Sequence, residues 1–199
     1  MNKILFLIIL FLSPIALAEV NLKKFSIEGI SIGDSVSDYF PGREITKNIV
    51  KQAGLTDEFY VAHFNKHKSF SQFDQIYFVI NPSAENVLFP IEGISAFIDF
   101  KQDIQKCFDQ KDYFFKQIMN IYKEEINKNL IDINTAIRPH PSDLSGKSTY
   151  EQTDIKFPNG FIRIACYDMQ AHNGKNDALI LDFFTEDVDR WLHNEIGNS

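Results

Sequence analysis

The sequence predicts an α+β fold: a mainly antiparallel sheet, one long helix packed on a face, and short helices at the start and end of the mature chain. Strand-like runs follow one another through short turns, an apolar stripe with helical spacing covers residues 101–128, and a capped helical pattern closes the chain. With 199 residues, 44% of them hydrophobic, the chain is long enough for one compact domain with a sizeable core.

Residues 1–18 have the composition of a secretory signal peptide. Lys3 precedes an apolar run over 4–12, and Ala16-Leu17-Ala18 supplies the small residues of a cleavage site. The alternative is an uncleaved membrane anchor, but the apolar stretch is short and Pro14 interrupts it, whereas a span needs about twenty residues. We therefore expect cleavage after Ala18, which leaves residues 19–199 as a single α+β domain.

The predicted signal peptide places the mature protein in the periplasm or outside the cell. Removing residues 1–18 takes away Lys3, so 19 basic and 27 acidic side chains remain, with a net charge of −8. This balance argues against nucleic acid as a partner, because binding phosphates requires clustered Lys and Arg. It also disfavours adsorption to anionic membranes, and we expect no stable membrane insertion after cleavage.

Two runs alternate like strands but change phase at a glycine, which is typical of a β-bulge. They cover residues 25–32, with Gly29 at the change, and 89–98, with Gly93 at the change. The pentapeptide Ile-Glu-Gly-Ile-Ser occurs in both. A duplication would explain this, but the flanking residues do not repeat, so a coincidence of strand-like sequence is the preferred interpretation.

Between these runs the pattern predicts two short helices and then two strands. Asp34 is placed to cap a helix over 35–40, and a second helix is predicted over 43–53. Strands are predicted over 59–64 and 76–80, where β-branched and aromatic residues gather.

The second half predicts the long helix, then strands over 150–157, 161–169 and 177–184, and a last helix capped by Thr185. Pro158-Asn159-Gly160 is a strong turn sequence between the first two of these strands. Core packing explains the stripe of the long helix without any cofactor, and none is predicted; its members are Ile104, Cys107, Phe108, Phe115, Ile118, Tyr122 and Ile126.

The two cysteines are predicted to form a disulfide bond. Cys107 belongs to the apolar stripe of the helix, and Cys166 shares a strand face with Ile162 and Ile164. Both thiols therefore face the core, and an exported protein with an even number of cysteines favours their pairing. The alternative is two buried free thiols.

The segment 138–149 concentrates polar side chains and supplies the candidate binding residues: His140, Asp143, Ser145, Lys147 and Ser148. Gly146-Lys147-Ser148 resembles the end of a phosphate-binding loop, but Pro141 stands where that loop needs glycine, so nucleotide binding is rejected. A hydrolase arrangement would pair Ser145 or Ser148 with Lys147 or His140. The alternative is an ordered connector stiffened by its prolines and by side-chain bonds to its own backbone.

No metal site is predicted. His63 and His67 have the spacing of two ligands on a helix, but they lie at the end of a strand-like run and in a loop, so exposed histidines are the expectation. The acidic group of Asp182, Glu186, Asp187 and Asp189 lacks the spacing of a calcium loop, and we attribute it to the N-terminus of the last helix.

Three strings carry a resemblance to other proteins: Phe-x-Ile-Glu-Gly-Ile-Ser-Ile-Gly-Asp-Ser (25–35), His-Pro-Ser-Asp-Leu-Ser-Gly-Lys-Ser-Thr (140–149) and Cys-Tyr-Asp (166–168). On these the chain resembles a group of small exported proteins of unknown function predicted from marine bacterial genomes. The resemblance covers most of the mature chain. It implies no particular activity, and no functional residues follow from it.

The leading hypothesis is a non-catalytic exported module that binds a partner protein or an envelope component, because the mature chain carries no complete catalytic or metal-binding pattern. The competing hypothesis is a small hydrolase with its site on residues 138–149. The two differ in geometry, since a hydrolase needs Ser145 or Ser148 within about 3 Å of a base in an open cleft.

Overall fold

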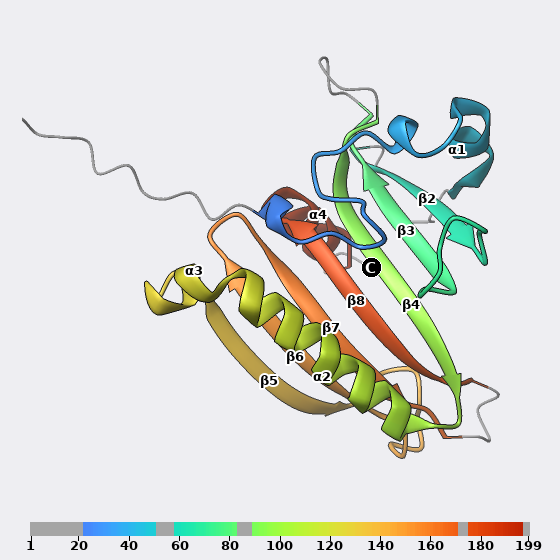
Figure 1. The fold of residues 1–199 in the computed structure, drawn as a ribbon. Helices are drawn as coiled ribbons and strands as arrows, with labels where there is room; N and C mark the ends of the chain where they lie inside the picture. Colours follow the sequence, from blue (N-terminus) through green and yellow to red (C-terminus); the bar gives the residue numbers. More distant parts are fainter. Residues whose placement is uncertain (1–21, 51–57, 83–88, 171–174, 197–199) are drawn as a thin grey trace, which may run out of the picture.

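The computed structural model describes residues 22–50, 58–82, 89–170 and 175–196 (Figure 1). The predicted signal peptide, residues 1–18, lies outside these residues. In the described part of the chain one sheet of eight antiparallel strands is the main feature, which confirms the predicted α+β class. Its strand order is β1-β2-β3-β4-β8-β7-β6-β5.

The strands form two meanders that meet in the middle of the sheet, where β4 pairs with β8. Within each meander, strands that follow one another along the chain pair antiparallel. The strands are β1 (Ile49–Val50), β2 (Tyr60–Asn65), β3 (Gln75–Ile80), β4 (Ile91–Lys101), β5 (Asp132–Pro139), β6 (Thr149–Phe157), β7 (Gly160–Asp168) and β8 (Asp177–Thr185).

Helices cover the two faces of the sheet unequally. The long helix α2 (Ile104–Ile121) lies across one face with the N-terminal segment, and α4 (Glu186–Ile196) packs on the opposite face over β7 and β8 (Figure 1). The remaining helices are the 3-10 turns η1 (Leu22–Lys24) and η2 (Val36–Asp38), and the α-helices α1 (Gly42–Asn48) and α3 (Lys123–Asn127).

The predicted long helix is shorter than expected and is divided at Tyr122. Tyr122 is fully buried, and its hydroxyl donates a hydrogen bond to the backbone oxygen of Leu22 at 3.1 Å. Asp103 begins the helix by accepting the backbone N–H of Lys106. The main core therefore lies between α2, the N-terminal segment and the sheet.

The predicted disulfide bond is confirmed. Cys107 of α2 and Cys166 of β7 are bonded, with their Cα atoms 5.8 Å apart. Both are buried, as the helical stripe and the strand alternation predicted. The bond joins the long helix to the centre of the second meander.

The two Ile-Glu-Gly-Ile-Ser copies adopt different structures. Residues 27–31 make a tight turn closed by the Ile27–Ile30 bridge, so the strand predicted over 25–32 was wrong; Glu28 and Gly29 both have positive φ there. In β4 the same letters form an extended strand with the predicted bulge, where Glu92 is the extra residue opposite Val79 and Ile80. Tertiary position, not the pentapeptide, decides the conformation.

Two further elements differ from the sequence analysis. The helix predicted over 43–53 ends at Asn48, after which the chain forms β1. The sequence predicts no strand between the long helix and residue 150, but residues 132–139 form β5. Seven of its eight residues are exposed, and an edge strand of this kind shows no alternation of buried and exposed residues from which to predict it.

Candidate functional site

The loop between β5 and β6 is held together by Asp143. The carboxylate of Asp143 accepts the backbone N–H groups of Ser145 (2.9 Å) and Ser148 (2.8 Å) and the hydroxyl of Ser145 (2.7 Å). These bonds to the ionised form hold the pKa of Asp143 well below its usual range. The loop thus has the self-bonded structure of an ordered connector.

The serines of this loop are poorly placed for the hydrolase hypothesis. Ser148 has no exposed surface, and its Oγ accepts the backbone N–H of Gln170 at 3.1 Å. The hydroxyl of Ser145 donates a hydrogen bond to the carboxylate of Asp143. Because the pKa of Asp143 is lowered, this carboxylate is a weak base for activating a serine. Lys147 is exposed.

The ring of His140 packs against two tyrosines of the sheet, Tyr150 and Tyr167. Its Nδ1 accepts the backbone N–H of Ser142 at 3.2 Å, and its ring packs edge-on against Tyr167, with centroids 5.6 Å apart. Burial lowers the pKa of His140, and Lys175 acts in the same direction. Of the five candidate residues, His140 is thus the one whose side chain contacts the face of the sheet opposite α2.

On that face, one residue from each of seven neighbouring strands lines up to form a row across the sheet. Each member stands directly opposite the next in the neighbouring strand, so all point to the same side of the sheet. From β2 to β5 the row is His63, Tyr77, Ser95, Asp182, Arg163, Asp154 and Asn134. We call its centre, formed by Ser95, Asp182, Arg163 and Asp154, the polar row.

The polar row is a chain of hydrogen-bonded pairs. Ser95 Oγ donates to Asp182 Oδ1 at 2.5 Å, and Arg163 Nε donates to Asp154 Oδ1 at 2.8 Å. Gln152 Nε2 donates to the other oxygen of Asp154 at 2.6 Å. The guanidinium also lies 5.0 Å from the ring centroid of Phe161, which adds a cation–π contact. Each polar group is therefore oriented by a neighbour.

Asp182 has the most perturbed acidity in this row. Burial raises its pKa to about 6, and the nearby Asp154 carboxylate acts in the same direction. The hydrogen bond from Ser95 and the charge of Arg163 oppose the shift without cancelling it. A carboxyl group near neutrality on a half-buried surface is typical of functional sites.

Stacked aromatic pairs stand beside the polar row. His63 stacks on Tyr77 with ring centroids 4.1 Å apart, and Tyr150 stacks on Tyr167 at 5.2 Å. Burial raises the pKa of Tyr167 to about 12, so this phenol stays a neutral hydrogen-bond donor at physiological pH. All four rings retain some exposed surface.

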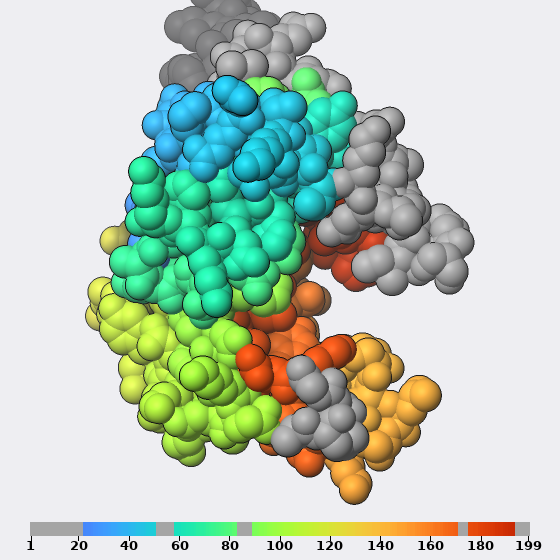
Figure 2. Space-filling model, turned by 90° about the vertical axis from the view of Figure 1, so that its right-hand side faces the viewer, coloured from blue at the N-terminus to red at the C-terminus, as the bar shows by residue number. Residues whose placement is uncertain are grey.

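This side of the molecule is hollowed between α4 (red) and the 138–149 loop (gold), as Figure 2 shows. Helix α4 covers the adjoining rows through Val188 and Trp191, which pack on Phe161, Phe184 and neighbouring side chains. The polar row and the tyrosine pair lie beyond that cover, on the part of the sheet that the helix leaves open. We call this part the open face.

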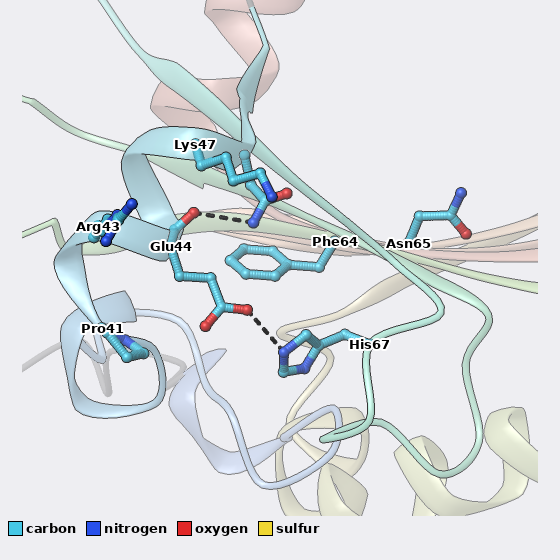
Figure 3. A pocket seen from close by; sticks show the side chains of 8 residues that line it. Pro41, Arg43, Glu44, Lys47, Phe64, Asn65 and His67 are labelled. Carbon is cyan, nitrogen blue, oxygen red and sulfur yellow. Dashed lines mark hydrogen bonds and ion pairs between the residues drawn. The ribbon is translucent and has the colours of Figure 1, made fainter.

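A second candidate site is a pocket of about 530 Å³ between α1 and β2 (Figure 3). His67 Nε2 lies 2.8 Å from Glu44 Oε1, and His67 Nδ1 accepts the backbone N–H of Ser69 at 3.2 Å. The proton of the neutral ring therefore sits on Nε2 and is donated to Glu44. Phe64 forms one wall, and Arg43 and Lys47 stand at the rim.

The two histidines considered as metal ligands point to opposite faces of the sheet. His63 stacks on Tyr77 on the side of the sheet that carries the polar row, whereas His67 packs against Phe40 and Phe64 on the other side. Both are half-buried, so the expectation of exposed histidines was wrong. Within the described ranges no group of three or more His, Cys, Asp or Glu side chains is placed to hold a metal ion.

Sequence reasoning missed the polar row. Asp182 lies in the strand predicted over 177–184, but the sequence pattern attributes its charge to the last helix, whereas in the structure it stands opposite Ser95 and Arg163. The alternation of the strands contained a usable pattern, because Arg163 and Asp182 each stand singly inside an apolar strand. Which strands are neighbours was needed to bring them together.

Comparison with family models, with curated proteins and with solved structures found no match to this chain. Among the residues that the structure describes, no helix is long and apolar enough to cross a membrane.

Proposed function

We propose that this protein is an exported, non-catalytic binding module, and that the open face of its sheet binds a carbohydrate of the cell envelope. The observation that carries the proposal is the polar row, which lies on a hollowed surface beside stacked aromatic rings. The signal-like N-terminus of the protein supports export. An exported protein meets the cell envelope, and for this reason we expect an envelope ligand.

The arrangement favours binding over catalysis. Asp154 is held by Arg163 and Gln152, and Asp182 by Ser95, so these groups are fixed as hydrogen-bonding partners. Such fixed polar groups on a concave surface provide orientation and specificity for a ligand. The hydrolase alternative has weaker support, since Ser148 is buried and Ser145 is bonded to a carboxylate of low pKa.

The chemistry of the open face suits a hydroxyl-rich ligand. Carboxylates accept hydrogen bonds from sugar hydroxyls, the guanidinium and amide groups donate to them, and an aromatic ring packs against the C–H groups of a pyranose. Two carboxylates stand beside one guanidinium, so the row favours a neutral or cationic ligand over an anionic one.

The test is binding of the mature protein to an array of bacterial envelope oligosaccharides. We expect retention on a subset of glycans, and a Tyr167→Ala variant should bind those at least about fivefold more weakly, because loss of one aromatic platform costs on the order of 1 kcal/mol or more. Tyr113→Ala is the matched control, since Tyr113 is an exposed tyrosine on α2.

Melting temperatures of both variants separate lost binding from lost folding. Failure to bind any glycan, or equal affinity in Tyr167→Ala and Tyr113→Ala, would contradict the carbohydrate proposal. Binding that strengthens between pH 5 and pH 7 would further support the role of Asp182, because its carboxylate becomes ionised in that range.

A further inference from the structure

Strand β5 is an exposed edge of the sheet with an apolar side. It forms the last strand in the sheet order, pairs with β6, and lies at the outer border of the fold (Figure 1). Ile137 is 70% exposed and Ile133 is 38% exposed, although β-branched residues are usually at least half-buried in sheets. An edge of this kind offers unpaired backbone groups to another strand.

We propose that β5 pairs antiparallel with β5 of a second copy of this chain, so that the two sheets join across a two-fold axis. The strand reads Asp-Ile-Asn-Thr-Ala-Ile-Arg over 132–138, and this order is complementary to itself when reversed. The axis passes through Thr135.

In that register, the end pairs are ionic and the pairs next to them are isoleucine with isoleucine. Asp132 stands opposite Arg138 of the second copy, and Ile133 stands opposite Ile137 of the second copy. Opposite charges and β-branched pairs are the cross-strand contacts that stabilise antiparallel sheets. Because the axis relates the two strands, each of these contacts is made twice.

The geometry of the sheet agrees with this register. When a two-fold axis runs perpendicular to a sheet, the residues that it pairs point to the same face of that sheet. The two residues of each proposed pair do lie on the same face of β5. Ile133 and Ile137 alternate with Asp132 and Arg138 along β5, so the isoleucines share one face and the charges share the other. A shift of two residues would lose both the ionic pairs and the isoleucine pairs.

The charges also explain why a second copy is the favoured occupant. An unrelated strand would have to supply an aspartate followed by an arginine six positions later, whereas a second copy carries them already. Pairing of β5 with β5 is isologous and uses the same edge of both chains, so it closes as a dimer. Pro139, which lacks a backbone N–H, ends the paired segment.

The dimer would place both α2 helices on one side and both open faces on the other. The joined segment has seven residues on each chain, about 23 Å in length, which is a small interface. We therefore expect a reversible dimer with a dissociation constant in the micromolar range.

The test is sedimentation equilibrium of the mature protein and of charge-exchange variants. Asp132→Arg alone and Arg138→Asp alone should each weaken the dimer at least about tenfold, because each places like charges opposite one another. The double variant, with both exchanges, should restore dimerisation. Asp38→Arg, an exposed reversal on η2, is the control and should leave the dimer unchanged.

The experiment separates the outcome that supports the dimer from the outcomes that contradict it. Recovery of the dimer in the double variant is the result expected, because it requires residues 132 and 138 of different copies to meet. A wild-type protein that stays monomeric at roughly 0.1 mM, about a hundred times a dissociation constant of about 1 μM, or a dimer that none of the β5 variants changes, would overturn the proposal. Circular dichroism of each variant checks that the fold is retained.

Discussion

Asp182 lies in the middle of β8, on the same side of the sheet as Ser95 and Arg163. Burial raises its pKa from 3.8 to about 6, so the folded protein holds this proton more tightly than the unfolded chain. The protonated Asp182 carboxyl makes its full contribution to the stability of the fold below the pKa that this group has in the unfolded chain. That contribution is lost as the pH rises through about 6. At neutral pH, the ionised carboxylate therefore costs stability.

We predict that Asp182→Asn raises the free energy of unfolding at pH 8 by about 1–3 kcal/mol, since each unit of pKa corresponds to about 1.4 kcal/mol. The neutral amide keeps an oxygen that accepts the Ser95 hydroxyl. The gain should shrink to near zero at pH 4, where the wild-type carboxyl is protonated. Urea denaturation at both pH values measures this, and an equal gain at both would refute it.

At the scale of elements, two side-chain links attach α2 to the second meander. The disulfide bond joins α2 to β7, and Lys111 of the same helix pairs with Glu151 of β6 at 2.5 Å. Lys111 is 6% exposed, so its ammonium lies under the helix and its partner is required for burial. The bond and the ion pair together fix the helix over β6 and β7.

We predict that replacing both Cys107 and Cys166 by alanine lowers the free energy of unfolding by up to about 4 kcal/mol. Loop closure over 59 residues gives this magnitude, because the bond restricts the unfolded chain. Urea titrations of the variant and of the oxidised wild type provide the comparison. Reductant should destabilise only the wild type; an unchanged midpoint in the variant without reductant would be inconsistent with this account.

At the scale of the whole molecule, Leu22, which lies close to the predicted cleavage point, already belongs to the main core. Leu22 is 3% exposed in the main core, and its backbone oxygen accepts the hydroxyl of Tyr122. Cleavage after Ala18 would leave this contact in place, since Leu22 follows four positions later. Export and a complete core are therefore compatible.

We predict that the mature protein begins at Glu19. Intact-mass and N-terminal peptide measurements on the cell-envelope and medium fractions of an expressing bacterium should find Glu19 at the N-terminus. Substituting Ala16 and Ala18 by leucine should block processing, because the cleavage site needs small residues. Protein from these fractions that retains Met1 would contradict the prediction.

The sequence by itself determined the features that depend on neighbouring residues. The turn at Pro158-Asn159-Gly160, the strands on either side of it and the final helix after Thr185 follow from local pattern and capping, and the structure has them at these places. The Cys107–Cys166 bond could also be predicted from the sequence, because helical and strand periodicity placed both side chains toward the core.

Tertiary structure alone decided the polar row and the edge strand. Ser95, Asp154, Arg163 and Asp182 come from four strands, and only the strand order places them in hydrogen-bonding distance. In the same way, β5 has no buried face of its own and is a strand because β6 pairs with it. Periodicity reports which way a side chain faces, whereas pairing between distant segments decides which side chains meet.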